Sequence, residues 1–288
     1  MIADLIKQKA RMPGVSISRL CERTNLSRRH YYRLRLRRPT VEDHLELRDQ
    51  IQRLALKWPS YGYRRISREL ARNGILANHK LVLRLMRTDN LLCLRKKRFV
   101  TTTDSNHQLP VYPNLARDMR LTGIDQLWIA DITYIRLQHE FIYLAVILDA
   151  FSRRCIGWSL ERYLDHRLTM AALRMALSNR KAPAGLVHHS DRGVQYAAKG
   201  YTELLMSYGI VISMSRRGNA YDNAKAERFM RTLKYEEVYL CDYDNMADAK
   251  QRIKQFIEGL YNRKRLHSAI GYVPPVEFEQ MLLKSATP

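Results

Sequence analysis

At residues 127–137 the chain reads LWIADITYIRL, an apolar run with a single acid, Asp131, near its middle. A run this rich in Ile, Leu, Trp and Tyr predicts a buried β-strand. An unpaired charge inside a buried strand costs free energy, so the carboxylate of Asp131 needs a compensating partner. The stretch therefore predicts both an element of a sheet and a candidate functional residue.

The chain that follows predicts an α/β domain. After a turn at His139-Glu140, the segments 141–151 and 154–161 predict a second and a third strand. The pattern then predicts helix, strand, helix, strand and two further helices, at residues 165–180, 185–190, 198–209, 210–215, 222–240 and 247–263. This is the element order of a ribonuclease-H-like domain with a mixed five-stranded sheet and flanking helices, although another α/β arrangement could share it.

Two further acids stand in comparable settings. Asp191 ends the apolar run of LVHHSDRGVQY, residues 186–196, and Glu227 lies on the helix predicted in GNAYDNAKAERFMRTLK, residues 218–234. Thirty-five residues separate Asp191 from Glu227, and Lys234 follows Glu227 by seven positions on the same helical face. Because a divalent cation can serve several carboxylates at once, these acids suggest a metal site.

Three convergent carboxylates suit the cleavage and transfer of phosphodiesters. Mg²⁺ prefers carboxylate oxygens, water and substrate phosphate as ligands. Two ions roughly 4 Å apart can serve the attacking and the leaving oxygen. We expect Asp131, Asp191 and Glu227 to be both the catalytic residues and the ligands of two Mg²⁺ ions, for which Mn²⁺ would substitute.

Each acid also has a structural alternative. Asp131 could pair with a buried arginine, Asp191 could be a turn residue, and Glu227 could form a surface ion pair with Arg231. For Asp191 or Glu227 alone such an alternative is at least as good, and only the combination favours the metal. The roles of His188 and His189 stay open between phosphate binding and structural hydrogen bonding.

Three neighbouring residues are expected to be structural. Trp128 and Trp158 suit the core better than base stacking. Asp149, at the end of the second strand, is expected to cap a turn with Ser152.

The charge of the chain indicates a polyanionic partner. The 288 residues carry a formal net charge of +22. Residues 1–100 hold 25 Lys and Arg against 8 Asp and Glu, whereas the rest of the chain holds 25 against 20. The first third is therefore predicted to bind double-stranded DNA, with an affinity that falls as salt rises.

Short helices carry this basic charge. Residues 1–40 contain two helical patterns within 16–37, typical of a helix-turn-helix. Residues 41–95 contain a second helical pair, in which Asn73-Gly74 ends the first helix and Asn78 caps the second. A basic linker, 96–120, leads to the catalytic core with a C-terminal helical tail at 121–288.

The residues expected to contact DNA have basic or amide side chains on these segments and on the helix of Glu227. They are Arg28, Arg29, Arg33, Arg64, Arg65, Lys96, Lys97, Asn219, Asn223, Lys225, Arg231 and Lys234.

Other classes of protein are disfavoured. The four cysteines are far apart and lack the spacing of a zinc site, so we expect incidental thiols in a reducing cytoplasm. The sequence has no apolar run of 18 residues and no segment typical of a signal peptide, so no membrane association is expected.

Several motifs together resemble one known family. WIADITYI around Asp131, LDAFSRRCIGWSL at 148–160, HSDRGVQY at 189–196, SRRGNAYDNAKAERFMRTLKYE at 215–236 and YNRKRLHSAIGYVPPVEF at 261–278 are similar to the IS3 family of insertion-sequence transposases, which belongs to the acid-triad transposases and integrases. YGYRRI at 61–66 resembles the helical DNA-binding region that precedes the core in that family.

The resemblance implies a function. Such a protein would bind the terminal inverted repeats of its element, cut one strand to leave a 3′-hydroxyl, and direct this hydroxyl onto another phosphodiester by direct transesterification. It would act in the bacterial cytoplasm, at the nucleoid, as at least a dimer on DNA. A plain metal-dependent nuclease and a non-catalytic DNA-binding regulator on the same fold are the alternatives.

Members of the family commonly act as fusions with an upstream reading frame that supplies another helix-turn-helix and a leucine zipper. This chain shows no heptad run long enough for a zipper. We therefore expect it to be the downstream-frame protein, with a possible fusion to the upstream frame.

Overall fold

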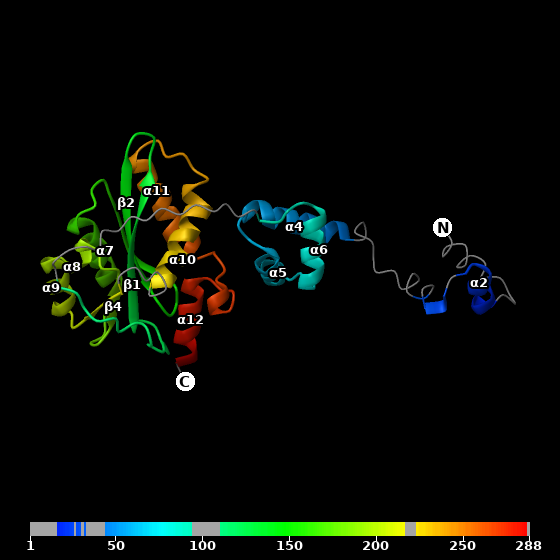
Figure 1. Ribbon diagram of the computed structural model, residues 1–288, viewed down its shortest axis with the longest axis horizontal. Coiled ribbons are helices and arrows are strands. Elements are labelled where there is room, and N and C mark those ends of the chain that lie inside the picture. The colour runs from blue at the N-terminus through cyan, green and yellow to red at the C-terminus, as the bar shows by residue number, and fades with distance from the viewer. Residues whose placement is uncertain are drawn as a thin grey trace. The chain divides into compact units, whose positions relative to one another are not determined.

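A computed structural model describes residues 16–25, 27–29, 32, 44–93, 110–216 and 223–286 of the chain (Figure 1). The chain divides into two compact units, residues 1–93 and 94–288. All four cysteines are free, as expected. Within the described ranges, none of the helices combines the length and the apolarity that crossing a bilayer requires.

The described part of the first unit is helical. The helices described there are α2 (Ile17–Arg23), α4 (Leu45–Lys57), α5 (Tyr63–Arg72) and α6 (His79–Thr88). The last three contribute buried side chains to one small core, among them Ile51, Ile66 and Leu85. The predicted end of α5 and start of α6 are confirmed: Gly74 has φ +81°, and the Asn78 side chain accepts from the Lys80 amide at 2.9 Å. Helix α4 was not predicted.

The second unit is built on a mixed sheet. Its described strands are β1 (Leu127–Arg136), β2 (Phe141–Asp149), β3 (Cys155–Glu161), β4 (Val187–Ser190) and β5 (Val211–Met214). They form a five-stranded sheet in the order β3-β2-β1-β4-β5. The first three strands pair antiparallel, and β1–β4 and β4–β5 pair parallel. The predicted element order and the ribonuclease-H-like architecture are confirmed.

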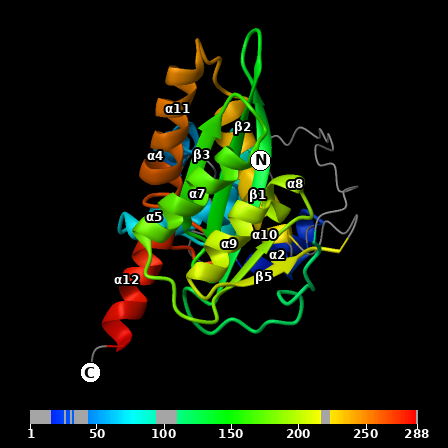
Figure 2. The same ribbon diagram turned by 90° about the vertical axis from the view of Figure 1, so that its left-hand side faces the viewer.

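Helices cover both faces of the sheet. They are α7 (His166–Asn179), α8 (Val194–Ala197), α9 (Lys199–Ser207), α10 (Ala224–Leu233), the π-helical turns η3 (Lys234–Val238) and η4 (Gln255–Tyr261), α11 (Met246–Lys254), the 3₁₀ turn η5 (Ser268–Ile270) and α12 (Pro275–Ala286). Helices α7, α8 and α9 lie on one face, and α10 and α11 lie on the other (Figures 1 and 2). The helix expected at 222–240 thus changes to π geometry at Lys234, and α8 was not predicted.

The alternation of side chains along β1 determines on which face of the sheet Asp131 lies. Leu127 and Ile129 belong to the hydrophobic cluster that includes α10, and Trp128 and Ala130 belong to the cluster that includes α7. Successive side chains of a strand point to opposite faces. Asp131 is therefore on the α10 face of the sheet.

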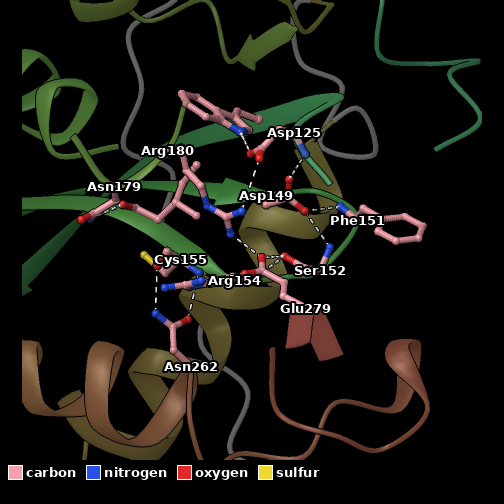
Figure 3. Close-up of polar contacts among 12 residues, drawn as sticks. Asp125, Asp149, Phe151, Ser152, Arg154, Cys155, Asn179, Arg180, Asn262 and Glu279 are labelled. Carbon is pink, nitrogen blue, oxygen red and sulfur yellow. Dashed lines mark hydrogen bonds and ion pairs between the residues drawn. The ribbon is translucent and has the colours of Figure 1, made fainter. Parts of the chain in front are cut away.

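The C-terminal helix α12 is joined to the sheet through a buried carboxylate. Glu279 is 5% exposed, and its carboxylate accepts from Ser152 Oγ and Arg154 Nη1, both at 2.6 Å, and from Arg180 (Figure 3). Arg180 also donates to Asp125 at 3.3 Å. These bonds tie α12 to the β2–β3 turn and to the end of α7.

The sheet edge at β3 is covered by side-chain amides. The Asn262 amide donates to and accepts from the backbone of Cys155, at 2.9 and 3.0 Å, and Asn179 donates to the Ile156 carbonyl at 2.9 Å (Figure 3). These groups occupy backbone positions that a neighbouring strand would otherwise use.

We predict that Gly157→Ala destabilises the second unit. A Cβ at Gly157 would lie 2.3 Å from the Ala172 carbonyl oxygen and 2.8 Å from the Ala176 backbone nitrogen, so α7 would have to move off β3. Overpacking against backbone should cost about 3 kcal/mol. Thermal unfolding should show a midpoint roughly 10 °C lower.

Gly200→Ala is the matched control, because its Cβ would meet only the flexible end of Met170 at 3.7 Å. Its midpoint should be unchanged or slightly higher, since alanine favours the helix. Equal midpoints for the Gly157→Ala variant and the wild-type protein would contradict the packing described here.

Candidate active site

Asp131 lies near the middle of β1, and its side chain is half-buried. Its carboxylate accepts a hydrogen bond from the following amide, that of Ile132, at 3.0 Å. No ion pair to an arginine is found for it among the described residues, in contrast to the structural alternative.

Asp191 directly follows β4, the parallel neighbour of β1. The register pairs Leu127 with Val187 and Ile129 with His189. Two residues further along each segment, the same alignment brings Asp131 beside Asp191. The two acids are thus side by side on adjacent strands, Asp131 near the middle of β1 and Asp191 just past the end of β4. Asp191 also accepts from the Gly193 amide at 2.9 Å, which makes it a turn residue as well.

Glu227 lies in the first turn of α10 and is exposed. Helix α10 buries Ala226, Phe229 and Leu233 against the sheet. Asn223, at its start, donates from its side-chain amide to the Ala130 carbonyl at 3.1 Å. This bond attaches the beginning of α10 to the residue before Asp131.

The three acids are electrostatically coupled at Asp131. Burial raises the pKa of Asp131 well above its ordinary value of 3.8, and the charges of Asp191 and, more weakly, Glu227 raise it further. The Ile132 amide and the Lys234 ammonium lower it. Burial also raises the pKa of Glu227. A bound cation would relieve this repulsion.

The donor set suits a hard divalent cation, because the coupled groups are carboxylates. Within the described ranges, however, no group of three or more acidic, histidine or cysteine side chains is close enough to enclose an ion. Asp131, near the middle of β1, and Asp191, directly after β4, are on neighbouring strands, and Glu227 is on α10.

Lys234 lies beside these acids, at the point where α10 becomes π-helical. Its ammonium is 4.5 Å from the centroid of the Tyr134 ring. Burial lowers the pKa of Lys234, and the charge of Asp131 opposes this shift. Lys234 therefore contributes positive charge at the acid site.

His188 and His189 are structural in this arrangement. His189 hydrogen-bonds through both ring nitrogens to Ser213 Oγ and Ser215 Oγ, at 2.8 and 3.1 Å. His188 Nε2 is 3.0 Å from the Tyr201 hydroxyl, and burial followed by the neighbouring His189 lowers its pKa to about 3. His188 is therefore neutral at physiological pH.

The other structural expectations are also met. Trp128 and Trp158 are buried. Asp149 accepts from the amides of Phe151 and Ser152, at 3.0 and 2.7 Å, and so caps the β2–β3 turn (Figure 3).

The expected DNA contacts differ in their exposure. Exposed side chains that could reach phosphate are Arg28, Arg29, Arg64 and Arg231, and half-buried ones are Arg65, Lys225 and Lys234. Asn223 is only 6% exposed and bonds to Ala130, so its placement favours a structural role over a phosphate contact. Arg33, Lys96, Lys97 and Asn219 lie outside the described residues.

Two residues that the sequence did not indicate are Tyr196, close to the acids, and Arg153, in the β2–β3 turn. The Tyr196 hydroxyl is buried and has no hydrogen-bond partner in the described part of the chain. Burial raises its pKa, and the charges of Tyr201, Asp191 and Asp131 add to the shift. Arg153 occupies the β2–β3 turn with a φ of +67°, a conformation that its sequence context did not indicate.

The chain is similar in sequence or structure to several known proteins. Residues 122–220 and 208–275 match the family described as integrase core domain, and residues 42–99 match the HTH-like domain. The simian T-cell lymphotropic virus intasome contains a chain with 15% identity and a TM-score of 0.47, over 80% of this chain and 74% of that one.

Two relatives are similar over nearly their full length. A 31 kDa protein of insertion element IS600 from Shigella sonnei is 38% identical over 91% of this chain and 97% of its own. The transposase InsF of insertion sequence IS3A from Escherichia coli K12 is 33% identical over 92% of this chain and 94% of its own. With these identities, an integrase core and an HTH-like region, the chain belongs to the IS3 family of insertion-sequence transposases.

Proposed function

We propose that this DNA transposase binds the terminal inverted repeats of its insertion sequence and catalyses Mg²⁺-dependent strand cleavage and strand transfer. The family and the integrase core support the class of enzyme, a polynucleotidyl transferase. The observation that carries the finer proposal is the coupling of Asp131 to Asp191 and Glu227, which gathers negative charge where a cation would be bound.

In the proposed reaction, water attacks the phosphorus at an element end, and the bond to the 3′-oxygen breaks. This step leaves a 3′-hydroxyl on the element and a 5′-phosphate on the flank. The 3′-oxygen then attacks a second phosphodiester, which joins the strands and releases a new 3′-hydroxyl. Each step exchanges one P–O bond for another and needs no covalent bond to the protein.

The residues of the chain have separate roles in this proposal. Asp131, Asp191 and Glu227 hold a pair of Mg²⁺ ions, for which Mn²⁺ substitutes; when bound, these supply Lewis acidity for the attacking and leaving oxygens. Lys234 and Arg231, on the same helical face as Glu227, orient the phosphate. Neutral His188 is buried against Tyr201 and takes no proton from the nucleophile.

Binding is assigned to the basic helices. Arg64 and the other exposed cations of the first unit would contact phosphates of the element end, and a synapse of two ends would require at least a dimer. We further propose that the protein acts in the bacterial cytoplasm and can be joined to an upstream-frame protein. A plain nuclease and a DNA-binding regulator remain the alternatives to be tested.

We predict that Asp131→Asn, Asp191→Asn and Glu227→Gln each remove strand joining while end binding persists. Each variant loses a carboxylate ligand, so joined product should fall at least about a hundredfold. Labelled element-end duplexes incubated with Mg²⁺ or Mn²⁺ and resolved on denaturing gels measure this. Glu203→Gln is the control, because Glu203 is an exposed partner of Lys199 on α9.

Joining that survives in the Asp131→Asn variant would overturn the proposed site. Wild-type protein that binds ends without any metal-dependent product would be a regulator. Wild-type protein that cuts any duplex and joins none would be a nuclease.

We also predict that Asp131→Asn stabilises the protein in the absence of divalent metal. The pKa of Asp131 is higher in the folded state than its ordinary value of 3.8 in the unfolded state. Below pH 3.8 the carboxyl is protonated in both states and costs no stability. As pH rises through the folded pKa, the buried carboxylate must ionise, and the free energy of unfolding falls. Asparagine cannot ionise. At pH 7 in EDTA the variant should be about 1–2 kcal/mol more stable, or a few degrees higher in midpoint.

Addition of Mg²⁺ should raise the midpoint of the wild-type protein and leave that of the Asp131→Asn variant nearly unchanged. Asp165→Asn provides the contrast, because hydrogen bonding to Arg167 lowers the pKa of Asp165. That variant should gain no stability at pH 7. An Asp131→Asn variant less stable than wild type in EDTA would show that Asp131 is paired in the fold.

A further inference from the structure

Arg153 holds a backbone conformation that favours glycine. Its φ is +67°, in the left-handed region, within the turn that joins β2 to β3. Two backbone bonds of 2.9 Å close this turn, from the Arg153 amide to the Asp149 carbonyl and from the Asp149 amide to the Arg154 carbonyl. A long side chain kept at a position where glycine fits better suggests that the side chain is used.

The buried ionic network described above holds the turn in place. Ser152 and Arg154, the neighbours of Arg153, both bond to Glu279, and the Asp149 carboxylate accepts from the Asp125 amide at 2.7 Å (Figure 3). Since each of these partners is itself fixed, the position of Arg153 is set before any ligand arrives.

Two cations of α10 lie close to Arg153. The Asn223 side chain attaches the start of α10 to Ala130 on β1. Two residues before Ala130, Trp128 pairs with Asp149, where the β2–β3 turn begins. The start of α10 is therefore near this turn. Lys225 and Arg228 are three residues apart and so share a face of this helix. The charge of Arg153 acts on Lys225, and that of Arg228 acts on Arg153, so the three side chains are neighbours.

These three cations form no ion pair. In the described ranges no ion pair joins Arg153, Lys225 or Arg228 to a carboxylate. The neighbouring acid, Asp149, acts on Arg153 and Lys225 through its charge, but its oxygens are bonded to the amides of Asp125, Phe151 and Ser152. Clustered cations that form no ion pair indicate an anion as the missing partner.

We propose that Arg153, Lys225 and Arg228 form a binding site for a backbone phosphate of duplex DNA, separate from the acid site. Lys225 is nearly opposite Glu227 around α10, because two residues turn a helix by roughly 200°. The phosphate bound there would therefore belong to a different stretch of backbone from the one that reacts. The inference rests on the proposed function, since it takes DNA as the ligand.

The test uses Arg153→Gly in the full chain. Glycine fits the positive φ, so the variant should fold with an unchanged or slightly higher thermal midpoint. In EDTA, where no reaction occurs, its affinity for an element-end duplex and for an unrelated duplex of equal length should fall about three- to tenfold, and the slope of log K against log salt should decrease by about 1. Fluorescence anisotropy over a salt series measures both.

Arg174→Ala is the charge-matched control. Arg174 is exposed on α7, which packs on the face of the sheet opposite to α10. The DNA affinity and the salt slope of the Arg174→Ala variant should therefore equal those of the wild-type protein. With Mg²⁺, strand joining by the Arg153→Gly variant should fall at subsaturating DNA and recover as the DNA concentration is raised, so the change lies in KM and not in kcat.

An Arg153→Gly variant with wild-type affinity and salt slope would overturn the proposal. A loss restricted to the element-end duplex would also overturn it, because a phosphate contact does not depend on sequence. Failure of the proposed function has a different signature: the wild-type protein itself would then bind no ends or join no strands.

Discussion

The parallel pairing of β1 with β4 is the constraint on which the candidate active site depends. It brings Asp131 and Asp191, sixty residues apart in the chain, side by side on two adjacent strands. Burial disfavours the charged form of Asp131, and the charge of Asp191 disfavours it further. Helix α10 brings a third acid, Glu227, toward this pair, and Lys234 follows at its C-terminal end. Helices α7 and α9 cover the opposite face of the sheet. The fold thus concentrates negative charge in a protein of strongly positive net charge.

The arrangement of cations complements that of the acids. Lys234 lies near Asp131, and Arg153, Lys225 and Arg228 lie around the other side of α10. A single helix therefore separates a region suited to metal from one suited to phosphate. The helix is held at its start by Asn223 and along its length by buried apolar side chains such as Phe229. Both regions depend on the same short connection between α10 and β1.

The strands and the order of elements could be predicted because local sequence determines them, and local sequence also led to the three acids, which stay a prediction. Asp131 stands out in an apolar run, and the boundaries of α5 and α6 follow from Gly74 and Asn78. The roles of Asn223 and Glu279 could not be predicted, since each depends on a partner far away in the chain, Ala130 and Arg154. The positive φ of Arg153 was missed for a similar reason: the turn is imposed by its supports, against the preference of arginine.

The anchoring of α12 has a consequence for how copies of such an element decay. All three acids precede residue 228, so a gene shortened near its end would still encode the complete set. The shortened protein would lack Glu279, however, and would leave the half-buried guanidinium of Arg154 and the buried one of Arg180 without their shared counter-ion. Loss of a late segment with no chemistry of its own would thus weaken the fold that holds the acids.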